Sequence, residues 1–308
     1  MKSLVIAAVA ACGIAAGAAE KAKEAEPAKE SGKEESKFPV SVEAGISLDT
    51  KFMSYGLVDN KDPIVTPSAS VKFFDWVGIG VEALFDTTKY GKRGRWEDGP
   101  DYGNRAGKYF ELDPSVTVGH SFSNEDFAWI PACIGSVEFE LGYSYEYHPR
   151  HMGGKTGEPG DDTQFVTLSF GLPDLWLEPA FEIERDIDRD NGTYFNLELG
   201  HAFPLIKGAG EDDDPVLAFR PSVAQGLGTS KRTYGYGLSE SHGGLMDTCV
   251  KGELKWKICD YLSLSGYVAY YDYVFDRNLR HAAREYEASG HDDTSYHFVA
   301  GIGLTASF

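Results

Sequence analysis

The chain has 308 residues, of which 42% are hydrophobic and 25% charged, and its formal net charge is −19. That hydrophobic share is too high for a disordered protein, and the acidic balance argues against a nucleic-acid partner because phosphates would repel it. Beyond the extreme N-terminus, no apolar run reaches the roughly 18 residues that a membrane-spanning helix needs. The 35 Gly, 17 Tyr and 18 Phe favour an all-β protein with many tight turns.

The N-terminal segment predicts export. Residues 1–19 have the basic start, the apolar stretch and the small-residue cleavage site of a signal peptide. A lipoprotein signal that ends at Cys12 is the alternative. Residues 20–37 carry almost no apolar side chains and cannot bury enough surface to offset the entropy of ordering, so we expect a charged, flexible periplasmic tether. Residues 38–308 then form the folded domain.

The C-terminal segment alternates with a period of two from Thr294 onward, which places two sets of side chains on opposite faces of a strand. A chain that ends on such a strand with a terminal Phe resembles the insertion signal of bacterial outer-membrane barrels. The resemblance implies that the barrel-assembly machinery binds this strand. The residues of the signal are then Tyr296, Phe298, Ile302, Leu304 and Phe308.

Similar alternation along the chain predicts twelve strands, an even number as single-chain bacterial barrels require. The predicted strands are 39–57, 64–73, 77–90, 108–122, 134–148, 163–171, 175–186, 193–203, 216–226, 245–257, 261–276 and 294–308. The connections alternate between short and long. We therefore predict an all-β, antiparallel, up-and-down transmembrane β-barrel with short inner turns and longer outer loops. A soluble β-sandwich is the alternative.

The placement of aromatic residues agrees with a barrel in the outer membrane of a Gram-negative bacterium, with both termini in the periplasm. Trp76, Trp176 and Trp256 fall at the predicted inner ends of strands, together with Phe203 and Phe308. Belts of aromatic side chains are expected where strands meet lipid headgroups. The expected neighbours of the outer surface are the outer-membrane lipids and lipopolysaccharide.

The first predicted strand ends in a Ser-Tyr outer turn within residues 49–56 (DTKFMSYG). A short acidic loop at 59–63 (DNKDP) and a second strand with PSASV at 67–71 follow. This stretch of the chain, residues 40–90, resembles the TorF-like porin family of outer-membrane proteins. The family's usual Arg-Gly after the Tyr is absent. The resemblance implies passive transport without catalytic residues.

The inward-facing positions of the predicted strands are mainly acidic. Charges in a dry interior would be costly, so either water fills the lumen or the charges pair with one another. The first hypothesis is a porin-like channel for passive diffusion of small solutes that prefers cations. The second is a non-transporting barrel whose charges interlock and whose loops bind a partner. Candidate pore-lining residues are Glu43, Glu82, Glu138, Glu140, Glu182, Glu198, Arg220, Lys251 and Lys255; further inward acids include Asp86, Glu111, Glu146, Glu178 and Glu184.

We expect no catalytic residues, no cofactor and no metal site. A membrane-embedded hydrolase would need a serine held by a histidine, and the eight His suggest no such pair. Asp186, Asp188 and Asp190 begin like a calcium loop, but Asn191 stands where that loop requires Gly, so a solvated turn is favoured.

Overall fold

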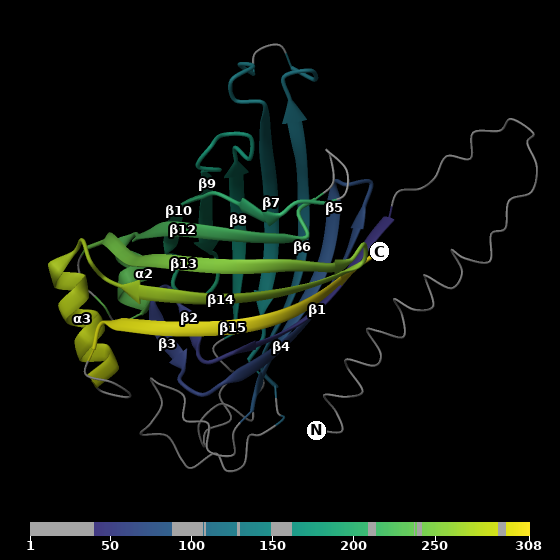
Figure 1. Ribbon diagram of the computed structural model, residues 1–308. Coiled ribbons are helices and arrows are strands. Elements are labelled where there is room, and N and C mark those ends of the chain that lie inside the picture. Colours follow the sequence, from purple (N-terminus) through teal and green to yellow (C-terminus); the bar gives the residue numbers. More distant parts are fainter. Residues whose placement is uncertain are drawn as a thin grey trace, which may run out of the picture.

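The computed structural model describes residues 40–87, 107, 109–127, 130–148, 162–208, 214–236, 238, 242–288 and 294–308 (Figure 1). The predicted signal peptide (1–19) and tether (20–37) lie outside the described residues, as do the central parts of two predicted outer loops, 91–107 and 149–162. The described part of the barrel domain begins at Val40.

Twelve antiparallel strands close into one barrel, and each pairs with its sequence neighbours around the ring. The barrel strands are β1 (Val40–Asp49), β4 (Ile64–Phe73), β5 (Val77–Asp86), β6 (Tyr109–Ser123), β7 (Ser136–Glu146), β8 (Thr163–Gly171), β9 (Ala180–Asp186), β10 (Thr193–Gly200), β12 (Leu217–Gly228), β13 (Gly244–Cys259), β14 (Leu262–Asp272) and β15 (Tyr296–Ser307). The first and last strands close the ring, from Glu43↔Ser307 to Asp49↔Gly301. The predicted up-and-down barrel is confirmed.

The two ends of the barrel differ in their connections. The end that carries 50–63, 87–108, 147–162, 187–192, 229–243 and 273–295 is called the loop end, and the opposite end, with 74–76, 124–135, 172–179, 201–216 and 260–261, is called the turn end. The turn end also carries the end of β15 and a short strand, β11 (Phe203–Ile206), which pairs with β12 beyond β10. The connection 172–179 is longer than predicted, because β9 begins only after Pro179.

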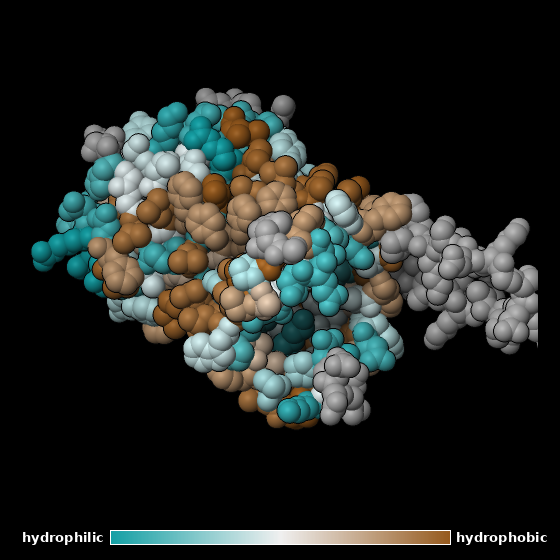
Figure 2. Space-filling model, turned by 90° about the horizontal axis from the view of Figure 1, so that it is seen from above, coloured by the Kyte–Doolittle hydropathy of each residue, from teal (hydrophilic) through white to brown (hydrophobic). Residues whose placement is uncertain are grey.

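Apolar side chains alternate onto the outer face of the strands. On β5, Val77, Ile79 and Val81 are exposed, and the same alternation runs along β13 and β15. Figure 2 shows apolar side chains gathered across the middle of one face of the barrel. The aromatic residues predicted for the inner ends, Trp76, Trp176, Phe203, Trp256 and Phe308, are all exposed at or near the turn end. An apolar wall with aromatic side chains at its edge is the surface that lipid favours.

The loop end contains three elements that the sequence did not predict: a hairpin of β2 (Phe52–Ser54) and β3 (Leu57–Asn60), and two helices, α2 (Ser230–Gly235) and α3 (Arg277–Ala288). Neither described helix has the length and apolar composition that a bilayer-spanning helix needs. The predicted strand 39–57 is therefore wrong beyond Asp49. The chain leaves the barrel there, because β1 and β4 remain paired only as far as Asp49↔Ile64.

A hydrophobic core fills the loop end of the barrel. It joins the hairpin, the barrel wall and α3 through buried side chains of Leu57, Tyr194, Leu238, Met246, Tyr273, Leu279 and Ala283. A smaller cluster of Ile64, Leu84 and Phe110 packs against Phe52 of the hairpin. Burial of one such side chain contributes about 1.5–3 kcal/mol, so these contacts stabilise the folded loop end.

Candidate functional site

The β2–β3 hairpin crosses the barrel from one wall to the other. It leaves the ring between β1 and β4, and its tip reaches β9, which lies six strands from β1 in a ring of twelve and is therefore opposite. There the Tyr55 hydroxyl donates a hydrogen bond to the Glu184 carboxylate. The Tyr55 ring lies 4.7 Å from that of Tyr194 on β10, and Tyr273 donates to the Tyr55 carbonyl at 2.6 Å.

The turn of the hairpin is tight and closely docked. Tyr55 and Gly56 both have positive φ angles, 50° and 80°, as the twist of a two-residue β-hairpin requires. A Cβ atom on Gly56 would lie 2.3 Å from the Cβ of Asp247 on β13. Glycine is therefore needed both for the backbone conformation and for the close approach to the wall.

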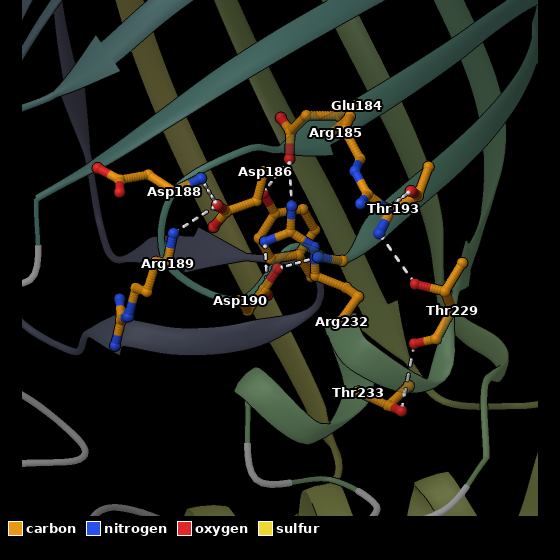
Figure 3. Close-up of polar contacts among 12 residues, drawn as sticks. Glu184, Arg185, Asp186, Asp188, Arg189, Asp190, Thr193, Thr229, Arg232 and Thr233 are labelled. Atoms are coloured by element: carbon orange, nitrogen blue, oxygen red, sulfur yellow. Dashed lines mark hydrogen bonds and ion pairs between the residues drawn. The ribbon is translucent and has the colours of Figure 1, made fainter.

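Arg232 of α2 fastens the hairpin tip to the wall. Figure 3 shows its contacts with Glu184 and Asp190 as dashed lines. The arginine side chain is 1% exposed, and its guanidinium lies 3.2 Å from Glu184 and 3.2 Å from Asp190. The same group stands over the Tyr55 ring, 4.8 Å from its centre. A buried arginine with two carboxylates and an aromatic face holds three segments together, because removing any partner would leave a buried charge unsatisfied.

The β9–β10 connection is ordered around this arginine. Asp186 is 1% exposed and accepts hydrogen bonds from the backbone N–H groups of Asp188 and Arg189 at 2.9 and 2.8 Å. The prediction of a solvated turn is wrong for Asp186 and Asp190, since both carboxylates are used inside the protein. It holds for Asp188, which is exposed.

Burial sets the ionisation of the groups in this cluster. Burial raises the pKa of the Tyr55 hydroxyl well above its ordinary value, and the nearby negative groups raise it further. Burial also raises the pKa of Asp190, although Arg232 opposes that shift. Burial by itself would lower the pKa of Arg232, but its tyrosine and carboxylate neighbours together raise that pKa above its ordinary value. Arg232 therefore stays charged and Tyr55 stays a hydrogen-bond donor.

Three cavities lie within the described part of the lumen. The turn-end cavity, of about 620 Å³, is lined by five carboxylates but by only one lysine: Lys72, Asp75, Glu138, Glu140, Glu182 and Glu198. The hairpin cavity, of about 380 Å³, lies beneath Tyr55 and shares Glu182 with the first. The third, of about 360 Å³, lies on the β1 side of the hairpin and shares Met53 with the second. The hairpin thus stands between two of the cavities.

Some of the candidate pore-lining residues line a cavity and others do not. Four of them, Glu138, Glu140, Glu182 and Glu198, come together around the turn-end cavity, while Glu82 lines the cavity on the β1 side. Glu43 and Lys255 are exposed and line none of these three cavities. The acids therefore outnumber the bases around the cavities.

Some of the inward charges pair with one another. Arg220 contacts Glu178 at 3.4 Å and also forms an ion pair with Glu198, and Lys251 lies 3.3 Å from Glu253. Glu138 and Glu140 form no ion pair with a described lysine or arginine. Paired charges and unpaired acidic walls, the features of the two hypotheses, therefore occur in the same lumen, and Glu198 both pairs with Arg220 and lines the turn-end cavity.

A separate cluster lies on the wall of the hairpin cavity. Glu111, Glu146 and His148 place one ligand atom each within 4.8 Å of one another. The alternation of the strands predicted that Glu111 and Glu146 face inward but did not connect them with His148. The Glu-x-His pattern of residues 146–148 could have indicated the cluster, because a period of two puts the Glu and His side chains on one face of the strand.

Comparisons with known proteins were made at three levels: family models, curated proteins and solved structures. A scan against protein-family models finds no match, and a search of curated proteins finds none either. Among solved structures, a KdgM porin has a TM-score of 0.44 at 10% identity, with 87% of this chain and 99% of that chain covered.

Two further solved structures are similar at the same TM-score. An outer membrane channel of the COG4313 group from Pseudomonas putida F1 has a TM-score of 0.44 at 7% identity, with 91% of this chain and 100% of that chain covered. LpxR from Salmonella typhimurium also has a TM-score of 0.44 at 7% identity, with 86% of this chain and 99% of that chain covered.

Proposed function

We propose that this chain is an outer-membrane channel for passive diffusion of small solutes, that it prefers cations, and that the β2–β3 hairpin narrows its passage. One observation carries the proposal: a closed barrel with an apolar outer face encloses a cavity whose lining holds five carboxylates and one lysine. Water must fill such cavities, because unpaired carboxylates in a dry interior would cost several kcal/mol each. Acidic walls then raise the local concentration of cations.

The location and orientation belong to the same proposal. An apolar strand wall without open edges is what lipid requires, and the predicted signal peptide supports export. We infer residence in the outer membrane of a Gram-negative bacterium, with the turn end and both termini in the periplasm and lipopolysaccharide around the loop end. The last strand would bind the barrel-assembly machinery through Tyr296, Phe298, Ile302, Leu304 and Phe308, four of which lie exposed on the outer face of β15. Membership of the TorF-like porin family and the absence of catalysis stay part of this proposal.

The second candidate is a non-transporting barrel whose loop end binds a partner. The packed core of the loop end favours it, because Leu57, Tyr273 and Leu279 are each at most 1% exposed and close off that part of the lumen. Conductance distinguishes the two candidates, since a barrel that is plugged throughout passes no ions.

The test is single-channel recording of the refolded chain in a planar bilayer under a salt gradient. We expect discrete openings and a reversal potential that indicates cation preference. Glu138→Gln with Glu140→Gln should move the reversal potential toward zero, because the two carboxylates on β7 face the turn-end cavity. Glu125→Gln, an exposed carboxylate on the connection 124–135, is the matched control and should change nothing. A correctly folded but silent barrel would support the second candidate.

A further inference from the structure

We propose that Glu111, Glu146 and His148 form a binding site for a divalent transition metal of the zinc type at the loop end of the β6–β7 pair. The three ligand atoms converge within 4.8 Å. Glu111 and His148 are 6% and 7% exposed, so two of the three residues are buried. The proposal does not rest on conduction, because metal binding can be measured on the folded barrel in detergent.

The register of the strands explains why these residues meet. The bridge Leu112↔Tyr147 continues the antiparallel pairing of β6 with β7 that includes Ser115↔Ser144. It therefore places Glu111 opposite His148 and Asp113 opposite Glu146. All four side chains point to the same face of the barrel, since residues two apart on a strand share a face.

The distances in the cluster suit a tetrahedral metal. The His148 Nε2 atom lies 3.2 Å from Glu111 Oε2 and 3.5 Å from Glu146 Oε1. Zinc binds nitrogen and carboxylate oxygen at about 2.0–2.1 Å, so two ligand atoms of a tetrahedral zinc site are separated by about 3.3 Å. One imidazole and two carboxylates are a ligand set that favours zinc or a similar transition metal over calcium, which prefers oxygen ligands alone.

The charges around the cluster point independently to a cation. Register places three carboxylates in one row across adjacent strands, with Glu82 opposite Asp113 and Asp113 opposite Glu146. Like charges directly opposite each other destabilise a sheet. A bound dication would offset that repulsion.

A polar side chain at the end of this row also lacks a partner. Thr163 on β8 lies opposite Glu146 and is 2% exposed. Its hydroxyl has no hydrogen-bond partner among the described residues. A buried hydroxyl without a partner is costly, and a metal or its bound water beside Glu146 would supply one.

The test is equilibrium dialysis of the untagged, refolded full chain against Zn²⁺, with the bound metal counted by mass spectrometry. We expect one high-affinity zinc per barrel. Substitution of His148→Ala, or of Glu111→Gln with Glu146→Gln, should weaken binding at least about tenfold, since even supporting residues of metal sites are worth that much. Cobalt bound at the same site should show the absorption of a tetrahedral complex.

The matched control is His281→Ala with Glu285→Gln. This pair also places a histidine nitrogen and a carboxylate oxygen 3.5 Å apart, but both side chains are exposed on α3, so its removal should leave zinc binding unchanged. Heat-modifiable electrophoretic mobility confirms that each variant is folded, and the Gln variants keep the shape of the side chains if His148→Ala fails to fold. Absence of stoichiometric zinc, zinc binding that survives in the folded variants, or a calcium preference unaffected by His148→Ala would each overturn the proposal.

Discussion

The loop-end and turn-end halves of this barrel are made from the same strands but have opposite interiors. In the loop-end half, the hairpin, α2 and α3 bury an apolar core, and Arg232 satisfies two carboxylates. In the turn-end half, carboxylates surround the turn-end cavity and Lys72 is the one lysine among its lining residues. The difference shows that charge is handled differently at the two ends: Arg232 and its carboxylates are buried and paired in the loop-end half, whereas Glu138 and Glu140 of the turn-end half face a cavity.

Among the substitutions that test the difference between the two halves, Arg232→Ala should have the largest effect, because it disrupts the packing of the loop-end half. It leaves Glu184 buried without its cation and releases the hairpin tip, and removal of one partner of a buried ion pair costs about 3–5 kcal/mol. We expect the loop-end half to open locally, with increased protease cleavage near Tyr55 and larger conductance. Arg189→Ala, which changes an exposed arginine of the neighbouring turn, is the control. Wild-type protease resistance and conductance in Arg232→Ala would show that the guanidinium does not hold the hairpin.

Leu141→Arg should have a somewhat smaller effect, and it tests the outer wall that both halves share. Leu141 lies in the middle of β7 and is 47% exposed on the outer face. A charge at the middle of a lipid-facing strand costs about 2–4 kcal/mol. The adjacent substitution Glu140→Gln, on the inner face, should cost less than about 1 kcal/mol. Urea unfolding in lipid vesicles measures both, and equal effects would contradict the assignment of the two faces.

The alternation of the sequence predicted most of the barrel, because a strand between lipid and water must alternate. The twelve strands and the closure of the last on the first follow from that constraint, and the ends of most strands agree with the structure. The hairpin did not follow. The pattern of residues 39–57 predicts one continuous strand. Tyr55 has a positive φ angle in the hairpin turn, a conformation for which Asn, Asp or Gly is the usual sequence signal.

The buried polar clusters could be predicted only in part. Sequence pattern placed Glu111, Glu146 and Glu184 on the inner face, which the structure supports. It did not indicate that Arg232 would enter the lumen from α2 or that Glu111 would stand opposite His148. Such contacts depend on how loops fold back over the barrel and on the register between strands, and neither is encoded in the period of one segment.

The most direct test of the account compares the single-channel conductance of the wild-type chain with that of a variant in which residues 50–63 are replaced by Asn-Gly. Asp49 and Ile64 are directly paired, so a two-residue turn can join β1 to β4 without disturbing the ring. If the hairpin narrows a water-filled acidic lumen, the shortened barrel conducts several-fold more than the wild type and retains its cation preference. If the shortened, correctly folded barrel conducts no more than the wild type, the hairpin does not restrict a passage and the lumen is not the channel.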